Sequence, residues 1–382
     1  MRCRICESPT SVLFESPSEI ALLSSATPIL GSTVVDLCQV CGHAQTRPVV
    51  NLPRYYESEY QFRVRSEDED DLYDRVGNKN IYRSDQQACL VETSIDLSRP
   101  MKVLDYGCGK ARSLKLLAER CPLLEPYVFD VSEAYRQFWN NFVPPERQAS
   151  ISIPCEWHDN MDLVLSFFAL EHVEEPGAFV ATLRRLLRPG GRAFVIIPNV
   201  LTNVSDLVVV DHVNHFSVVS LSYLFARAGF VDLHIDATSY RGAFVVGATR
   251  SAVHKLSVGN AFPDAGIKKL LDLGAYWLRL VDDIRAAEKA RPVTEKCAIY
   301  GSGIYGLFIA TALPDRTRVP CFLDQNPWRQ GLSLMGVPVW APDELSDDIR
   351  FVYVGLNPVL ARKAIEQVEV VHRVRRELFY LS

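Results

Sequence analysis

The sequence predicts an α/β protein in which two parallel sheets, each covered by helices, follow a small cysteine-bearing module. Short apolar runs alternate with helical patterns between residues 101 and 250, as is typical of a parallel sheet with helices on both faces. A second alternation begins near Cys297, and 382 residues are enough for two or three domains. We therefore expect a module at 1–50, a helical segment at 51–100, and domains at 101–250 and 251–382.

The composition excludes several classes of protein. Hydrophobic residues make up 48% and charged residues 23% of the chain, as in globular proteins. The net charge is −5, and Lys and Arg are spread along the chain, so no basic stripe is available for nucleic acid. No run approaches the roughly 20 apolar residues that cross a bilayer, and the N-terminus lacks a signal-peptide core. We expect a cytoplasmic protein, a monomer or small homo-oligomer, that binds neither nucleic acid nor membrane.

Two cysteine pairs, Cys3-x-x-Cys6 and Cys38-x-x-Cys41, carry the strongest local signal. Each pair can present two thiolates, and four thiolates complete the tetrahedral shell of a zinc ion. Because cysteine fills all four positions, no place remains for a reactive water, so the zinc is expected to be structural. Unrelated reduced thiols are the alternative. We expect the neighbouring His43 to face solvent rather than to compete with Cys41 as a ligand.

The segment at 51–100 combines three patterns. A tyrosine-rich stretch (Tyr55, Tyr56, Tyr60) comes first, an acidic run at 67–71 follows, and the remaining pattern predicts helices up to Pro100. We expect this segment to cover the site formed by the domain that follows.

The central domain is predicted element by element. Strands are expected at 103–105, 127–130, 163–166 and 193–197, with helices at 111–120, 132–142 and 178–188 between them. In the last of these helices, Phe179, Leu183 and Leu186 fall on one face, and the Pro-Gly-Gly at 189–191 ends it. A helix at 219–228 and strands at 231–236 and 243–248 then close the sheet. A further helix at 264–289 leads into the C-terminal domain.

A glycine-rich turn follows the first central strand, in the sequence Asp105-Tyr106-Gly107-Cys108-Gly109. Glycines let the backbone approach a ligand closely, and the carboxylate of Asp105 can orient the turn or a ligand amino group. Asp130 ends the next strand, where a carboxylate can bind both hydroxyls of a ribose. The turn alone would also fit a generic nucleotide site.

These motifs, together with Leu170-Glu171-His172-Val173 and the Leu-Arg-Pro-Gly-Gly at 187–191, resemble the class I S-adenosylmethionine (SAM)-dependent methyltransferases. The resemblance implies a seven-stranded, Rossmann-like sheet with SAM at the glycine turn. Ala111 stands where a third glycine is common, and its methyl group should be tolerated. The cofactor-binding residues that the resemblance implies are Asp105, Gly107, Cys108, Gly109, Asp130, Val131, Ser166 and Phe167.

The whole arrangement further resembles the nucleotide-sugar C-methyltransferases of deoxysugar biosynthesis, which have a four-cysteine module in front and a Rossmann-like domain behind. The C-terminal sequences Tyr300-Gly301-Ser302-Gly303 and the Asp-Gln-Asn-Pro-Trp-Arg-Gln-Gly at 324–331 are similar to segments of that family. Its members methylate a carbon beside a keto group, because a base removes the acidic proton and the enolate attacks the sulfonium methyl.

Two imidazoles are candidates for that base, since a histidine accepts protons near neutral pH. One is His172, and the other is His212, which Asp211 precedes in a segment resembling the family's Glu-His before Phe-Ser. The sequence departs from the family at two positions, because Val209 replaces a tyrosine and Asp211 replaces a glutamate. Transfer to a sugar oxygen therefore remains an alternative. The implied substrate-binding residues are Tyr60, Phe62, Asn199, His215, Tyr240, Asn326 and Arg329.

Other functional classes are also compatible with parts of the sequence. The glycine turn at 301–306, with Asp324 after it, fits the dinucleotide fingerprint, so an NAD-dependent oxidoreductase is one alternative. A non-catalytic scaffold with a vestigial cofactor site is another. Neither resemblance nor pattern names the sugar, the nucleotide or the carbon that is methylated.

Overall fold

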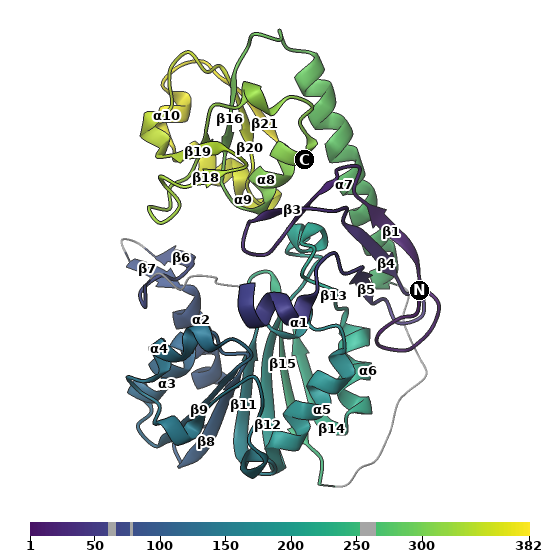
Figure 1. The fold of residues 1–382 in the computed structure, drawn as a ribbon, viewed down its shortest axis with the longest axis vertical. Coiled ribbons are helices and arrows are strands. Elements are labelled where there is room, and N and C mark those ends of the chain that lie inside the picture. The colour runs from purple at the N-terminus through teal and green to yellow at the C-terminus, as the bar shows by residue number, and fades with distance from the viewer. Residues whose placement is uncertain (60–65, 77–78, 253–264) are drawn as a thin grey trace.

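A computed structural model describes residues 1–59, 66–76, 79–252 and 265–382 (Figure 1). Three sheets organise the chain: a seven-stranded central sheet, a six-stranded C-terminal sheet, and a four-stranded N-terminal sheet that lies between them (Figure 1). No helix within these ranges combines the length and apolar character needed to cross a bilayer.

The N-terminal sheet is built from two distant parts of the chain. Its order is β1-β4-β5-β13, and the last strand, β13 (Asn214–His215), belongs to the central part of the sequence. Arg4 strengthens this junction, because its guanidinium donates to the carbonyls of Val213 (2.5 Å) and Thr46 (3.1 Å). The expected separate module at 1–50 thus shares its sheet with the central domain. Its own strands are β1 (Ser11–Glu15), β2 (Ile20–Leu22), β3 (Pro28–Leu30), β4 (Val34–Leu37) and β5 (Ala44–Thr46).

The segment after it is less helical than its sequence pattern predicts. An antiparallel hairpin interrupts it, pairing Leu72 with Tyr82 and Val76 with Lys79. The acidic run before the hairpin forms a loop, in which Lys110 donates to the carbonyls of Ser66 and Glu69. The elements are α1 (Leu52–Arg54), a π-helical turn (Tyr55–Glu59), β6 (Leu72–Val76), β7 (Lys79–Tyr82) and α2 (Arg83–Ser94).

The central sheet has the order β10-β9-β8-β11-β12-β15-β14. The first five strands are parallel, and β15 is antiparallel to both of its neighbours. Its strands are β8 (Met101–Tyr106), β9 (Leu124–Asp130), β10 (Gln148–Ser150), β11 (Met161–Phe167), β12 (Leu187–Pro198), β14 (Phe230–Asp236) and β15 (Ala243–Arg250).

The helices of this domain follow from the apolar periodicity. In α5, Phe179, Leu183 and Leu186 are buried as predicted, and Pro176 occupies the first turn, where its missing N–H costs nothing. The helix expected at 132–142 is only one turn, α4, preceded by a 3-10 turn. The helices are α3 (Arg112–Arg120), α4 (Arg136–Trp139), α5 (Pro176–Leu186) and α6 (Val218–Arg227).

The strand order positions a site. From β8 the chain moves outward through β9 to β10, and it then returns to the other side of β8 at β11. At such a reversal the loops after the two adjacent strands diverge and leave a crevice at their carboxyl ends. The glycine turn after β8 and the His172 loop after β11 both lie at this crevice.

The C-terminal domain is a second α/β layer structure. The 25-residue helix α7 (Ala265–Lys289) contacts β1 and leads to a sheet with the order β18-β19-β17-β16-β20-β21 (Figure 1). All neighbouring strands are parallel except β18, which pairs antiparallel with β19. The elements are β16 (Cys297–Tyr300), α8 (Ile304–Ala312), β17 (Phe322–Leu323), β18 (Ser333–Leu334), β19 (Val337–Trp340), β20 (Phe351–Val354), α9 (Pro358–Glu366), α10 (Glu369–His372) and β21 (Glu377–Tyr380).

Candidate functional site

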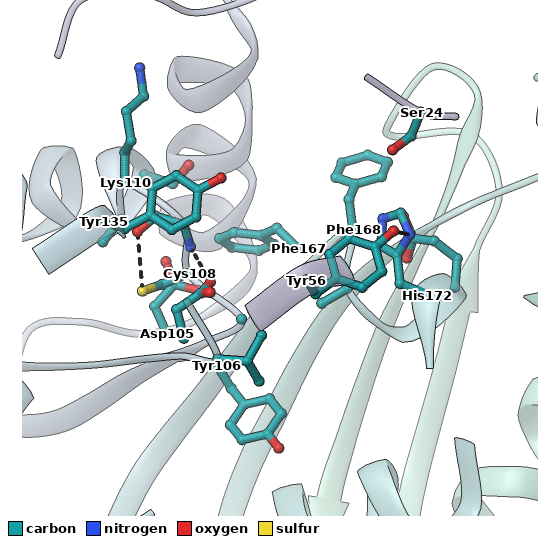
Figure 2. A pocket seen from close by; sticks show the side chains of 18 of the residues that line it. Ser24, Tyr56, Asp105, Tyr106, Cys108, Lys110, Tyr135, Phe167, Phe168 and His172 are labelled. Atoms are coloured by element: carbon teal, nitrogen blue, oxygen red, sulfur yellow. Dashed lines mark hydrogen bonds and ion pairs between the residues drawn. The ribbon is translucent and has the colours of Figure 1, made fainter. Parts of the chain in front are cut away.

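A cavity of about 1050 Å³ opens at the crevice of the central sheet. Residues from all three parts of the chain line it, from Ser24 in the N-terminal module to Arg329 in the C-terminal domain. Figure 2 shows Asp105 and Cys108 in one region of the cavity, and Tyr56, Phe168 and His172 in another. The cavity thus joins the glycine turn to the predicted imidazole.

The glycine turn is shaped by backbone constraints. Gly107 has a φ of +75°, and a Cβ there would lie 2.8 Å from the Cβ of Ala169, so no other residue fits without a shift. The carboxylate of Asp130 fixes the turn by accepting from the N–H groups of Gly109 (2.7 Å) and Ser132 (2.9 Å). Asp130, the residue predicted to bind the ribose, therefore also holds the glycine turn that faces the cavity.

Asp105 is the most informative group in this turn. Its side chain is buried, and its Oδ1 atom has no hydrogen-bond partner within the described part of the chain. Burial, with the nearby charge of Asp130, raises the pKa of Asp105 to about 8. A buried carboxylate oxygen without a partner is costly, so a cationic ligand group such as an ammonium fits this position well.

Seven of the eight predicted cofactor residues line the cavity, and the exception is Ser166. Ser166 is completely buried, and its hydroxyl donates to the carbonyl of Tyr106 at 2.9 Å. It therefore ties β11 to the end of β8 behind the cavity floor, while Phe167 lines the cavity. Ala111, expected to be tolerated, has a left-handed φ of +54°, which costs a non-glycine residue about 1 kcal/mol.

His172 belongs to a hydrogen-bonded group that the sequence did not reveal. The Tyr56 hydroxyl lies 2.5 Å from His172 Nδ1 and donates to Asp211 Oδ2 at 2.6 Å. The backbone carbonyl of Asp211 lies 3.1 Å from the same Nδ1. Ser24 completes the group, since its N–H and hydroxyl each donate to the Asp211 carboxylate at 2.7 Å.

His212 is supported by a different carboxylate from the one expected. Its Nδ1 lies 2.5 Å from Asp206 Oδ1, whereas Asp211 bonds to Tyr56 and Ser24. The second oxygen of Asp206 lies 2.7 Å from Nδ1 of His215. The rings of His212 and His172 meet edge to face, with centroids 4.6 Å apart. Asp206 is therefore the partner of His212, and Asp211 is part of the His172 group.

The two adjacent imidazoles are pushed toward opposite charge states. Burial and the charge of His212 lower the pKa of His172 to about 4. Burial also opposes the charge on His212, but the charge of Asp206 and its hydrogen bond outweigh burial and raise the pKa of His212 to about 9. A neutral imidazole thus lies beside a cationic one at neutral pH, and such a divergence is typical of acid and base partners in active sites.

Most of the predicted substrate residues do not reach the cavity. Arg329 lines it, but Asn199, His215, Tyr240 and Asn326 do not. Asn199, His215 and Tyr240 are buried, and Asn326 accepts from the N–H of Trp328. Tyr60 and Phe62 lie outside the described residues. The sequence-based choice missed Tyr56, Ser24 and Asp206, of which only Tyr56 carried a signal, as part of the tyrosine-rich stretch.

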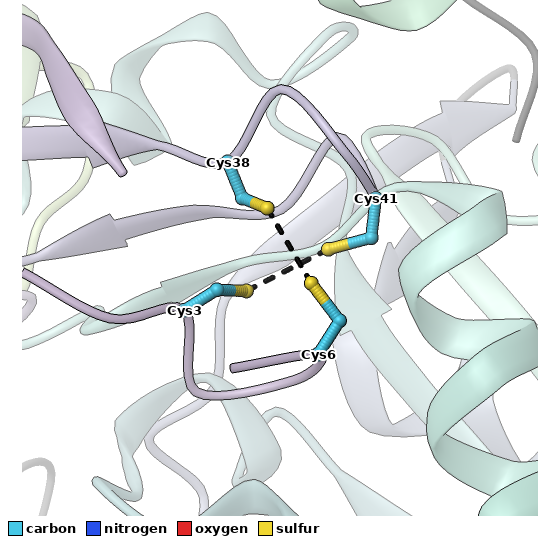
Figure 3. Close-up of side chains that lie close together, drawn as sticks. All are labelled: Cys3, Cys6, Cys38 and Cys41. Carbon is cyan, nitrogen blue, oxygen red and sulfur yellow. Dashed lines mark hydrogen bonds between the residues drawn. The ribbon is translucent and has the colours of Figure 1, made fainter. Parts of the chain in front are cut away.

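The four predicted metal ligands converge at the N-terminus (Figure 3). The sulfur atoms of Cys3 and Cys41 are 3.6 Å apart, those of Cys6 and Cys38 are 3.5 Å apart, and all four lie within 4.8 Å of one another. Zinc–sulfur bonds of about 2.3 Å in a tetrahedron require sulfurs about 3.8 Å apart, so the group fits a zinc ion. His43 is fully buried, contrary to the expected solvent-facing position, and its Nε2 lies 3.3 Å from Asn214 Oδ1.

Comparison with known proteins finds a match for the central part of the chain. Residues 84–235, from α2 to β14, match the family model described as a methyltransferase domain. The chain is similar to an S-adenosylmethionine-dependent methyltransferase from Mesorhizobium loti, with 15% identity and a TM-score of 0.36 over 43% of this chain and 98% of that one. It is also similar to the methyltransferase SibL, with 21% identity and a TM-score of 0.37 over 44% and 55% of the two chains. No curated protein matches the chain.

Proposed function

We propose that this enzyme, whose central part is a class I SAM-dependent methyltransferase domain, methylates a nucleotide-linked sugar at a carbon beside a keto group. One observation carries the proposal: two imidazoles, His172 and His212, meet edge to face in the cavity that the glycine turn also lines. Their surroundings shift their pKa values in opposite directions, down for His172 and up for His212. Removal of a proton beside a carbonyl requires a base at the carbon and a proton donor at the oxygen.

The cavity residues fit SAM. Bound SAM supplies a methyl group on a positively charged sulfur, from which a nucleophile can take it. Asp105 offers its unpartnered Oδ1 to the ammonium of the methionine part, and Asp130 lies at the strand end where ribose hydroxyls bind in this fold. Ser166 takes no part in binding, since it lies behind the cavity wall.

The hydrogen bonds around His172 determine where it can accept a proton. Tyr56 gives its single hydrogen to the Asp211 carboxylate, and the Asp211 carbonyl can only accept. Nδ1 of His172 must therefore carry the hydrogen, and the lone pair is on Nε2. Nε2 takes the proton from the carbon beside the keto group, while the electron pair of the broken C–H bond moves to the keto oxygen.

His212 acts at that oxygen in the proposed reaction. Its Nδ1–H donates to Asp206, and the cationic ring has a second N–H, on Nε2. This N–H can donate to the keto oxygen as negative charge develops there. The carbon of the resulting enolate then forms a bond to the methyl group, and the C–S bond breaks with its electrons moving to sulfur. Asp211 is a positioning residue, because it fixes Tyr56 and the ring of His172 and does not line the cavity.

Tyr56 bears on the choice between carbon and oxygen as the methyl acceptor. Val209, which stands where the resembling family has a tyrosine, is buried beside Leu22 and cannot supply a phenol. The Tyr56 hydroxyl lies 2.5 Å from the imidazole, but its hydrogen goes to the Asp211 carboxylate, so it orients the base and does not replace that phenol. In the proposed carbon methylation the enolate oxygen therefore relies on His212. Transfer to a hydroxyl needs the same base but no stabilised enolate.

We also propose that the four N-terminal cysteines hold a structural zinc ion. The sulfur spacing supports zinc, and four thiolates leave no open position for a reactive water.

The proposed activity is tested by incubating the protein with methyl-labelled SAM and a panel of nucleotide sugars that includes 4-keto forms. We expect mass spectrometry to show one added methyl group on a 4-keto sugar, and NMR to place it on the carbon beside the carbonyl. A methyl group on oxygen would support the alternative O-methyltransferase. No transfer to any nucleotide sugar, although SAM binds, would overturn the substrate assignment.

Replacing Asp105 with asparagine should weaken SAM binding about 10- to 100-fold, because a charge-assisted hydrogen bond to the ammonium is lost. Stability should change in the opposite sense. The folded-state pKa of Asp105 is raised to about 8, so wild-type stability falls as pH rises from about 4 through 8. Asp105→Asn has no carboxyl group to ionise here, so it does not lose stability in this way. Its melting temperature without SAM should therefore exceed that of the wild type, and the difference should grow as the pH rises toward 9. Equal SAM affinity in calorimetry would contradict the assignment of Asp105.

The pH dependence of kcat/KM should show two limbs. Activity should rise through about pH 4, as His172 becomes neutral, and fall through about pH 9, as His212 loses its charge. Asp206→Asn removes the charge that keeps His212 protonated, so the upper limb should move down to about pH 6.5 or below. Circular dichroism confirms that the variant is folded. An upper limb that stays near pH 9 in this variant would rule out the role of His212.

A further inference from the structure

Glu171 is a buried carboxylate at the reacting end of the cavity, and the proposed reaction gives it no role. It belongs to the 3-10 turn Leu170–His172 that follows β11, and it lines the cavity although its side chain is only 1% exposed. Its Oε1 atom lies 4.0 Å from Nε2 of His172. This is the nitrogen that takes the proton from carbon in the proposed reaction.

Glu171 is close to the second imidazole as well. One carboxylate oxygen of Glu171 and one ring nitrogen from each of His172 and His212 all lie within 4.8 Å of one another. A keto sugar that contacts the two imidazoles would therefore have the Glu171 carboxylate within reach of the substituents on its reacting carbon. The carboxylate is positioned to contact the part of the acceptor where the proton is lost.

The second carboxylate oxygen of Glu171, Oε2, has no hydrogen-bond partner among the residues that the structure describes. The cation Arg83 is near enough for its charge to act on Glu171, but it pairs with Asp71 at 3.6 Å and stacks on the ring of Phe168. A buried carboxylate oxygen without a donor is costly, so packing alone gives no reason for a glutamate at this position. A hydrogen-bond donor on a cavity ligand would satisfy it.

The protonation state of Glu171 determines the pH at which such a contact is best measured. Burial raises the pKa of Glu171 to about 7, although the charge of His212 opposes this shift. A carboxyl group keeps an acceptor oxygen in both protonation states. At pH 8 most of the Glu171 carboxyl is ionised, while His212, with a pKa of about 9, keeps its charge.

We propose that Glu171 selects the acceptor by accepting a hydrogen bond from a hydroxyl or amino group on the reacting carbon, the one beside the keto group. This inference rests on the proposed function and adds a specificity-determining residue to it. An ionised carboxylate is an acceptor only, so it recognises an O–H or N–H donor, whereas a deoxy carbon offers it none. With that substituent held by Glu171, the C–H bond of the same carbon can point toward Nε2 of His172.

The role of Glu171 is tested with three nucleotide-linked keto sugars that carry a hydroxyl group, an amino group or only hydrogen atoms on the reacting carbon. The kcat/KM for each sugar is measured at pH 8 in the wild type, in Glu171→Gln and in the control Glu119→Gln, which alters an exposed glutamate on α3. The wild type and the control should prefer the hydroxyl or the amino sugar over the deoxy sugar about 10- to 100-fold, as expected for a hydrogen bond to a charged group. The preferred sugar identifies the donor.

Glu171→Gln should lose most of this preference, because its neutral amide is a weaker acceptor, while kcat/KM for the deoxy sugar stays about the same. A change in the fold or in the imidazoles would lower kcat/KM for all three sugars alike, so the ratio between sugars reports the contact itself. No preference in the wild type, or an unchanged preference in Glu171→Gln, would overturn the proposal.

Binding measurements separate the role of Glu171 from the proposed activity. Calorimetry with S-adenosylhomocysteine bound gives the affinity for each sugar in the absence of reaction. If the sugars are methylated but Glu171→Gln keeps the wild-type ratios, only the role of Glu171 is refuted. If affinity depends on the donor and on Glu171 but no sugar is methylated, the contact stands and the reaction is refuted. If no sugar binds and none is methylated, both proposals fail.

Discussion

Replacing His172 with alanine should lower kcat for methyl transfer about 10²- to 10⁴-fold, the usual contribution of a positioned general base. The affinity for SAM should stay within twofold of wild type, because the glycine turn and Asp105 do not contact this imidazole. Replacing Tyr56 with phenylalanine should have a smaller effect, about tenfold, since the ring of His172 stays but one hydrogen bond that orients it is lost. The kcat of each variant is measured from initial rates, with saturating SAM and with the nucleotide sugar that the wild type methylates.

Solvent exchange distinguishes a base from a residue that only shapes the cavity. With S-adenosylhomocysteine bound and the keto sugar dissolved in D₂O, the wild type should incorporate deuterium beside the carbonyl, as NMR can follow. His172→Ala should lose this exchange. His234→Ala, which alters an exposed histidine on β14, is the matched control and should behave as wild type. Exchange and methylation that persist after both His172 and His212 are replaced would refute the imidazole mechanism.

Loss of the proposed zinc ion should abolish methyl transfer while leaving SAM binding largely intact. Structural zinc contributes about 10–16 kcal/mol of apparent binding free energy in zinc-finger peptides, as much as the whole stability of a typical domain. The N-terminal module should therefore unfold in Cys41→Ser. Ser24 and Tyr56 would then leave the His172 group, whereas Asp105 and Asp130 belong to the separate central sheet.

Three measurements check this expectation. Elemental analysis should find one zinc per wild-type chain and none in Cys41→Ser, thermal melting should show loss of a transition, and calorimetry should show SAM binding retained. The exposed cysteines Cys89 and Cys155 provide the control, because their replacement by serine should change none of these values. Zinc-free wild-type protein with full activity would disprove the structural zinc and the dependence of the active site on it.

The proposed active site is composite, and this accounts for the connectivity of the N-terminal module. Strand β13 completes the module's sheet only a few residues after His212, and Thr46 of β5 lies 2.8 Å from the ring of His215. Asp206 lies within hydrogen-bond distance of both His212 and His215. Hydrogen bonds therefore connect the N-terminal module, through His215 and Asp206, to His212. A module that folded apart from the central domain could not hold these groups in register.

The sequence by itself determined the central sheet and the cofactor end of the cavity. Strand and helix periodicities depend on neighbouring residues, and the positive φ of Gly107 in the turn between β8 and α3 favours glycine locally, so both leave a local signature. Asp105 and Asp130 could be predicted as cofactor-binding residues because each lies near the end of a strand. The cysteine pairs were recognisable for the same reason, since each knuckle is four residues long.

Only the tertiary structure decided the proposed reacting end of the cavity, around His172 and His212. Asp211 is next to His212 in the chain, but adjacent side chains outside a helix point in different directions, and the carboxylate that reaches His212 comes from Asp206. Tyr56 lies 116 residues before His172, so no local pattern connects them. Their meeting depends on how three sheets pack together, and that packing sums many weak long-range contacts that leave no signature in any short stretch of sequence.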